Sequence, residues 1–97
     1  MKQVTVVAVI AARPGKEAEM KQVLLSFIEP TRQEAGCIAY HLHTNADQPG
    51  KFLFLETWAS QAALDKHLKS PHMTKGFAQI TALSATAADI KLWEQIA

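Results

Sequence analysis

Residues 37–58 have the sequence CIAYHLHTNADQPGKFLFLETW, in which two alternating segments flank a polar link. Alternation at every second position is typical of a strand whose two faces meet different surroundings. The link, residues 45–50, contains Asn, Asp, Pro and Gly, which favour turns. One face is expected to carry Ile38, Tyr40 and Leu42 from the first segment and Phe52, Phe54, Glu56 and Trp58 from the second. The stretch therefore predicts an antiparallel hairpin.

The residues before the hairpin predict one strand and one helix. Residues 3–12 are apolar and rich in β-branched side chains, which favours a strand buried on both faces. Residues 16–31 repeat apolar side chains at helical spacing. Pro30 is expected to kink the last turn of this helix, and Gly36 is expected to end it.

The residues after the hairpin predict a second helical region and a last strand. Ser60 is expected to cap a short helix, and Ser70 with Pro71 to start another. Residues 85–94 alternate weakly and are interpreted as a strand. The resulting order β-α-β-β-α-β is the ferredoxin-like plan, so the fold class is predicted to be α+β.

The sheet face that points away from the helices is apolar in composition. The residues expected there include Thr5, Val7, Val9, Leu53 and Leu55. An apolar face of this size needs a cover, and the chain has no residues left to supply one. We therefore expect a homodimer in which the two sheets pack face to face.

Length and composition limit the range of functions. The chain has 97 residues and a formal net charge of +1, which indicates one domain over residues 1–97 without a basic patch for nucleic acid. No run approaches the length of a membrane span, and the β-branched run 4–12 favours a strand over a secretory signal. Cys37 is the single cysteine and is expected to pack as a small hydrophobe. These features favour a cytoplasmic protein with neither membrane nor nucleic-acid partners.

A longer pattern resembles the antibiotic biosynthesis monooxygenase domain family, in particular its quinol monooxygenase type. The residues that carry the resemblance are Glu56, Trp58, Ser60, Ala63, Leu64, His67, Leu68, Pro71, His72 and Met73, together with Arg13-Pro14-Gly15, the segment from Arg32 to Cys37, and Tyr40. The resemblance implies a dimeric α+β barrel of ferredoxin-like subunits. It also implies oxygenation of a small quinol or polyphenol by O₂ without flavin, haem or metal. The sequence contains no motif for a cofactor, in agreement with this expectation.

Two histidines are the candidate catalytic bases. His67 shares a helical stripe with Leu64 and Leu68 and is expected to point inward, and His72 begins the next helical segment. An imidazole in an apolar pocket can take a proton from a phenol near neutral pH. Each histidine could instead serve only to stabilise the helix break at Ser70-Pro71.

Aromatic and acidic residues form the expected substrate-binding set of Trp58, Tyr40, Glu56, Phe54 and Phe77. Trp58 offers a flat ring for stacking, or an ordinary core side chain. Glu56 lies on the same strand face and could orient an imidazole, although a structural ion pair with Arg32 is the favoured interpretation. Tyr40 could donate its hydroxyl to a substrate oxygen or simply pack.

Alternatives to the oxygenase remain open at this point. His41 and His43 share a strand face but lack a third ligand at suitable spacing, so no metal site is expected. Haem-degrading relatives carry Asn and His where this chain has about Ala8 and Phe77, which argues against haem as substrate. A non-catalytic module that binds small ligands and a non-oxidative isomerase are the competing functions, since fold alone does not fix activity.

Overall fold

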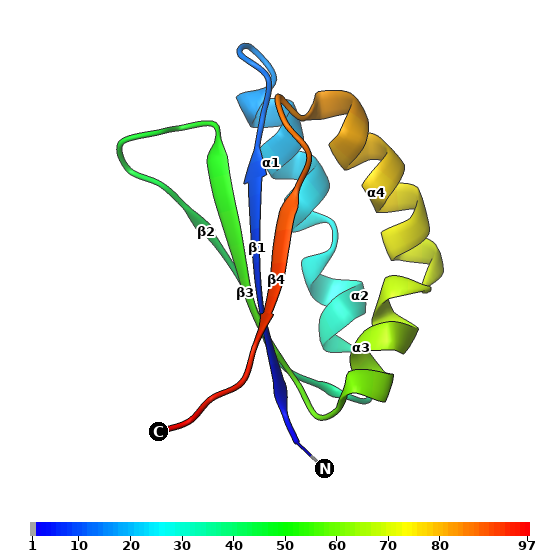
Figure 1. The fold of residues 1–97 in the computed structure, drawn as a ribbon. Helices are drawn as coiled ribbons and strands as arrows, with labels where there is room; N and C mark the ends of the chain where they lie inside the picture. Colours follow the sequence, from blue (N-terminus) through cyan, green and yellow to red (C-terminus); the bar gives the residue numbers. More distant parts are fainter. Residues whose placement is uncertain (1) are drawn as a thin grey trace.

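The computed structural model describes residues 2–97, which form one sheet with helices on one of its faces (Figure 1). The elements in chain order are β1 (Val4–Ala11), α1 (Glu17–Leu25), α2 (Ile28–Arg32), β2 (Cys37–Thr44), β3 (Lys51–Trp58), α3 (Gln61–Leu68), α4 (Pro71–Leu83) and β4 (Asp89–Trp93). All neighbouring strands are antiparallel, in the order β2-β3-β1-β4. The α+β ferredoxin-like fold is confirmed.

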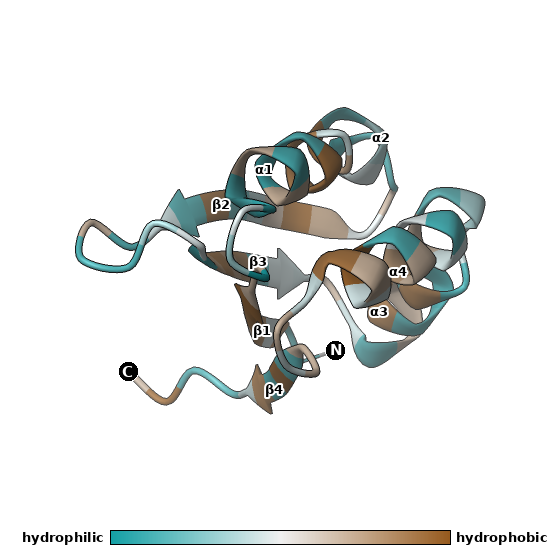
Figure 2. Ribbon diagram, turned by 90° about the horizontal axis from the view of Figure 1, so that it is seen from above, coloured by the Kyte–Doolittle hydropathy of each residue, from teal (hydrophilic) through white to brown (hydrophobic). Residues whose placement is uncertain are grey.

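The core lies between the sheet and the helices. Every second residue of β1 is buried against the helices, namely Val6, Ala8 and Ile10, whereas the residues between them are only partly covered. The view along the layers shows α1 and α2 over β2 and β3, with α3 and α4 beside them on the same side (Figure 2). β1 was expected to be buried on both faces. In a single chain it is fully covered only on the face toward the helices.

The first helical region is split, where the sequence analysis predicted one helix with a late kink. α1 ends at Leu25 and α2 begins at Ile28. Pro30 has no N–H to donate to the carbonyl of Ser26, and its ring would collide with that carbonyl in a continuous helix. The chain tightens instead, and the N–H of Phe27 donates to the carbonyl of Leu24 at 3.2 Å. The break lies before the proline, by about one turn.

A β-bulge corrects the expected faces of β2. Cys37 lies opposite Trp58 and Ala39 lies opposite Thr57, so Ile38 is an extra residue between them. Ile38 is 52% exposed and does not share the buried face with Tyr40. Strict alternation had placed Ile38 inside, because sequence periodicity does not reveal a local insertion of one residue.

Close approach of backbones sets the position of α3. A Cβ atom added to Gly36 would lie 2.2 Å from the Cβ of Ala63 in α3. Gly36 was expected to end a helix, and its structural role is instead to let α3 approach the start of β2. Ser60 caps α3 as expected, since its side chain accepts a hydrogen bond from the N–H of Ala63 at 3.2 Å. No helix within residues 2–97 is long and apolar enough to cross a membrane.

Candidate functional site

A narrow cavity lies between the sheet and the helices and contains about 40 Å³ of free volume. Most of its walls are apolar, and three polar side chains line it: Tyr40 from β2, Glu56 from β3 and His67 from α3. Phe54 and Phe77 also line the cavity. Five of the seven site residues predicted from the sequence therefore meet at one place, although they come from four different elements.

His67 is held at the cavity by a carboxylate. Its side chain is 1% exposed, and its Nδ1 lies 2.6 Å from Oε2 of Glu34. Because an ionised carboxylate only accepts hydrogen bonds, it places the proton of the neutral ring on Nδ1 and leaves a lone pair on Nε2. Burial lowers the pKa of His67, and the hydrogen bond and charge of Glu34 oppose this shift. The arrangement keeps a neutral imidazole ready to accept a proton.

The indole ring of Trp58 packs against the imidazole ring of His67 and does not line the cavity. The indole and imidazole ring centroids are 4.5 Å apart with a 32° angle between the planes. The indole Nε1–H donates to Oε1 of Glu56 at 2.9 Å. The ring is completely buried, so it orients two polar side chains of the cavity at once.

Glu56 is a buried carboxyl whose protonation depends on its surroundings. Burial raises its pKa to about 7, the hydrogen bond from Trp58 opposes this, and the charge of Glu34 adds to it. The expected pair with Arg32 is wrong: the guanidinium donates to the backbone carbonyl of Tyr40 at 2.9 and 3.3 Å. Glu56 is therefore available as a proton donor or acceptor near neutral pH.

Tyr40 places a neutral hydroxyl near the cavity. Burial is the largest cause of its raised pKa, and a hydrogen bond with Thr31 acts in the opposite direction. The ring packs on Phe54 with centroids 4.8 Å apart. Since the hydroxyl stays protonated, Tyr40 can donate a hydrogen bond to an oxygen in the cavity.

His72 does not line the cavity, although its ring lies next to that of His67, with centroids 5.8 Å apart. Its Nε2 is 3.4 Å from Oε2 of Glu34 and 3.1 Å from Oγ1 of Thr31. An open surface hollow over α3 and the start of α4 has Glu34 and His72 in its wall. The structure thus separates the two predicted bases: His67 faces the cavity and His72 faces the outside.

Glu34 is the residue that the sequence analysis missed. It lies in the loop between α2 and β2, where neither helical nor strand periodicity indicates a direction. The loop is held by backbone hydrogen bonds, from Glu34 to the carbonyl of Thr31 at 3.0 Å and from Cys37 to the carbonyl of Glu34 at 3.1 Å. Its one signal in the sequence is a place in the Arg32–Cys37 segment that carries the family resemblance.

Glu34, His67 and His72 are also the residues that could hold a metal ion. Within residues 2–97 their ligand atoms lie within 4.8 Å of one another. Two ligands of one tetrahedral zinc, with bonds of about 2.0–2.1 Å, lie about 3.3 Å apart. The 2.6 Å between Glu34 and His67 is instead the length of a charge-assisted hydrogen bond. The geometry as it stands is that of a shared proton.

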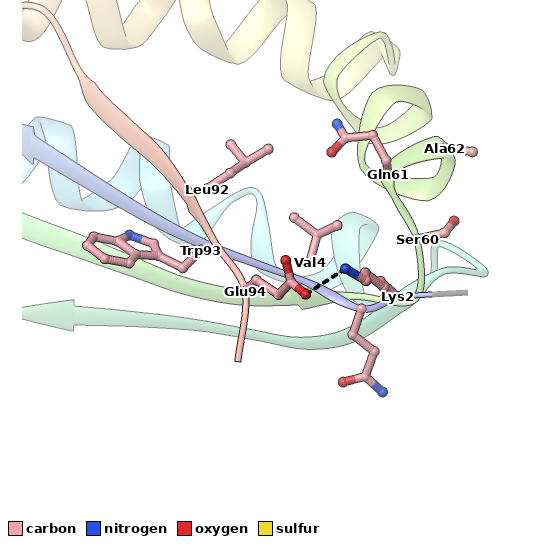
Figure 3. Close-up of a pocket in the computed structure, with 9 residues that line it drawn as sticks. Lys2, Val4, Ser60, Gln61, Ala62, Leu92, Trp93 and Glu94 are labelled. Carbon is pink, nitrogen blue, oxygen red and sulfur yellow. Dashed lines mark ion pairs between the residues drawn. The ribbon is translucent and has the colours of Figure 1, made fainter. Parts of the chain in front are cut away.

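A second hollow lies at the free ends of β1 and β4, beside the start of α3 (Figure 3). Its volume is about 570 Å³, and an ion pair of 2.9 Å between Lys2 and Glu94 lies at its wall. The hollow contains none of the predicted site residues. Because neither His67 nor His72 lines this hollow, the cavity is the candidate active site.

Comparisons with known proteins place the chain among monooxygenase-type domains. Residues 3–79 match the family model for antibiotic biosynthesis monooxygenase. The structure of Rv0793 from Mycobacterium tuberculosis has a TM-score of 0.93 at 32% identity, covering 98% of this chain and 96% of that one. PA3566 from Pseudomonas aeruginosa also has a TM-score of 0.93, at 29% identity, with 100% and 97% covered.

A longer relative matches over part of its length. The uncharacterized protein sll1783 of Synechocystis is 35% identical over 85 residues, which are 88% of this chain and 58% of that protein. The chain therefore spans little more than half of that relative. The family match, the relatives and the fold agree, and the chain belongs to the antibiotic biosynthesis monooxygenase family.

Proposed function

We propose that the protein is a cofactor-independent monooxygenase that oxidises a small quinol or polyphenol with O₂. The observation that carries the proposal is a buried imidazole, oriented by Glu34, in the wall of an apolar cavity that Tyr40 also lines. A deprotonated dihydroxyaromatic reacts with O₂ directly. The protein then needs to supply a base, a hydrogen-bond donor and exclusion of water.

Each cavity residue has a role in this reaction. Nε2 of His67 takes the proton of one phenolic hydroxyl, and Tyr40 donates a hydrogen bond to the resulting oxyanion. The electron-rich ring reduces O₂, one oxygen atom bonds to a ring carbon, and the other leaves as water. A quinol and O₂ thus give a hydroxyquinone and water, with atoms and electrons balanced. Phe54 and Phe77 provide flat walls for the ring.

Substrate access requires a wall of the cavity to move. The free volume of about 40 Å³ is far below the roughly 300–1,000 Å³ of typical ligand pockets. β4 is paired only with β1, and its side chains Ile90 and Leu92 line the cavity while 40% and 51% exposed. Displacement of this edge strand is the proposed route of entrance.

The proposed assembly is a homodimer through the outer sheet face. Leu55 and Trp93 on that face are 41% and 58% exposed, beside the half-buried Val7 and Val9. A second copy would cover these side chains. Light scattering at micromolar concentration should give twice the 10.7 kDa of one chain, and a monomer would contradict the proposal. The single cysteine fits the reducing cytoplasm as location.

The test of the activity is O₂ consumption with reduced 1,4-naphthoquinols. Wild-type protein should consume O₂ well above the rate with His67→Ala, because such quinols oxidise slowly by themselves. A Lys21→Ala variant, changed on the exposed surface of α1, is the control and should keep the wild-type rate. Equal rates for all three proteins would overturn the oxygenase. Binding without turnover would then favour a ligand-binding module, and turnover without O₂ would favour an isomerase.

A further inference from the structure

The two predicted histidines are connected through one carboxylate oxygen. Oε2 of Glu34 lies 2.6 Å from Nδ1 of His67 and 3.4 Å from Nε2 of His72. The side chain of His67 is 1% exposed, that of Glu34 is 20% exposed and that of His72 is 24% exposed. The ligand atoms of the three groups lie within 4.8 Å of one another, and side-chain exposure rises from His67 to Glu34 and His72.

A second contact fixes the surface histidine. Nε2 of His72 is 3.1 Å from Oγ1 of Thr31, and Thr31 is completely buried. This contact holds the His72 ring beside Glu34.

We propose that Glu34 and His72 form a proton relay through which the sealed His67 exchanges protons with solvent while the cavity stays closed. The relay rests on the proposed function, since it serves the base of that reaction. Glu34 and His72 act through His67 and are positioning residues, not catalytic ones. The path runs through the side chains of Glu34 and His72, because the other walls of the cavity are mostly apolar.

The relay conserves protons at each step. As the substrate O–H bond breaks, its proton bonds to Nε2 of His67, and the proton on Nδ1 moves to Oε2 of Glu34. Glu34 passes this proton to Nε2 of His72, whose other ring nitrogen releases one to water. Reversal of these steps protonates the reduced oxygen as water forms, so His67 regains its first tautomer and no net proton is lost.

The charged groups around the relay come from three elements. On the solvent side, Asp65 and Lys66 of α3 and Lys69 directly after it line the same hollow as Glu34 and His72. On the cavity side, the titratable neighbours are Tyr40 and Glu56. The Tyr40 ring packs edge-on against the His67 ring, with centroids 5.7 Å apart. Glu56 accepts a hydrogen bond from Trp58, which packs on His67. Variants that test the relay leave all of these residues unchanged.

The first test is chemical rescue of His72→Ala. In dilute, non-imidazole buffer, kcat for O₂ uptake with a reduced naphthoquinol should fall by about tenfold or more, while KM changes by less than about twofold. Added free imidazole should restore kcat in a saturating manner and leave wild type and Lys21→Ala unchanged. A loss of kcat that imidazole does not restore indicates a structural role and would overturn the relay, as would an unchanged kcat.

The second test does not depend on turnover. In protein labelled with ¹⁵N-histidine, without substrate, the exchange of the His67 Nδ1 proton with water is measured by NMR. The relay predicts exchange at least about tenfold slower in His72→Ala than in wild type, with recovery in imidazole. Equal exchange in the two proteins overturns the relay whatever the activity. Slower exchange in a protein that consumes no O₂ supports the relay and rejects the oxygenase instead.

Discussion

Nδ1 of His67 lies 2.6 Å from Oε2 of Glu34, although α3 and the loop after α2 lie far apart in the sequence. The contact depends on Gly36, which lets α3 approach that loop, and on Ser60, which fixes the start of the helix. A carboxylate that holds one nitrogen of a buried imidazole makes the other nitrogen a directed base. The predictions below begin from this pair.

Two replacements of Glu34 should distinguish its role in orienting the His67 ring from its role in accepting the Nδ1 proton of that ring. Glu34→Gln keeps an oxygen that accepts the Nδ1–H of His67 but cannot take its proton. Glu34→Ala removes the acceptor and leaves a buried N–H unpaired, at a cost of about 1–3 kcal/mol in the free energy of unfolding. We expect Glu34→Gln to be the more stable variant while both lose activity. Urea denaturation and O₂ uptake measure the two effects, and equal stability of the variants would contradict the expectation.

The pH dependence of activity should follow the low pKa of His67. Burial lowers this pKa, so the neutral base persists below the usual value of about 6.5. The acid limb of kcat/KM should therefore lie below pH 6.5 in wild type. Glu34 raises the pKa, so the acid limb of Glu34→Gln should lie at still lower pH. A limb that moves upward in this variant would show that another group controls the rate.

The buried carboxyl of Glu56 should make the protein less stable as pH rises. Its pKa is raised from 4.5 to about 7, so between these values the folded state binds a proton that the unfolded state has lost. Relative to Glu56→Gln, which can still accept from Trp58, wild type should lose up to about 3 kcal/mol from pH 4.5 to above 7. Thermal or urea denaturation across this range measures the difference, and parallel curves for the two proteins would refute it.

The close approach at Gly36 gives a test of packing. In Gly36→Ala the new Cβ would lie 2.2 Å from that of Ala63, so one segment must shift. We expect a loss of about 1–3 kcal/mol in stability, as for other overpacked sites. The double variant with Ala63→Gly removes the collision and should recover part of the loss, although glycine costs about 1 kcal/mol within a helix. No recovery would indicate that Gly36 is needed for another reason.

Much of the fold follows from local patterns. The hairpin, the strand 3–12, the cap Ser60 and the helix start at Pro71 were predictable because periodicity and capping act over a few residues. Ser70 precedes that helix as expected, but its side chain donates to the carbonyl of His67 and does not cap the helix. The split before Pro30 was misplaced, since a proline disturbs the turn before it rather than its own position. Gly36 was assigned to a helix end because a close tertiary contact leaves no local trace.

The candidate site was predictable for residues on regular elements and not for the loop. Five of the predicted side chains line the cavity because strand and helix faces determine direction. Glu34 has no such periodicity, and its contact with His67 joins segments that only the tertiary fold brings together. The division of the two histidines between cavity and surface depends on the helix break at Ser70, whose effect on direction cannot be read from spacing.

The bulge at Ile38 shows where this chain can change in length. Cys37 lies opposite Trp58 and Ala39 lies opposite Thr57, so Ile38 is accommodated without moving a ladder partner. Removal of Ile38 would leave a regular ladder in which Tyr40 still lies opposite Glu56, on the cavity side. Gly36 has no such freedom, because a side chain there would collide with Ala63. The strand therefore tolerates a deletion at position 38, whereas the loop before it is restricted in its side chains.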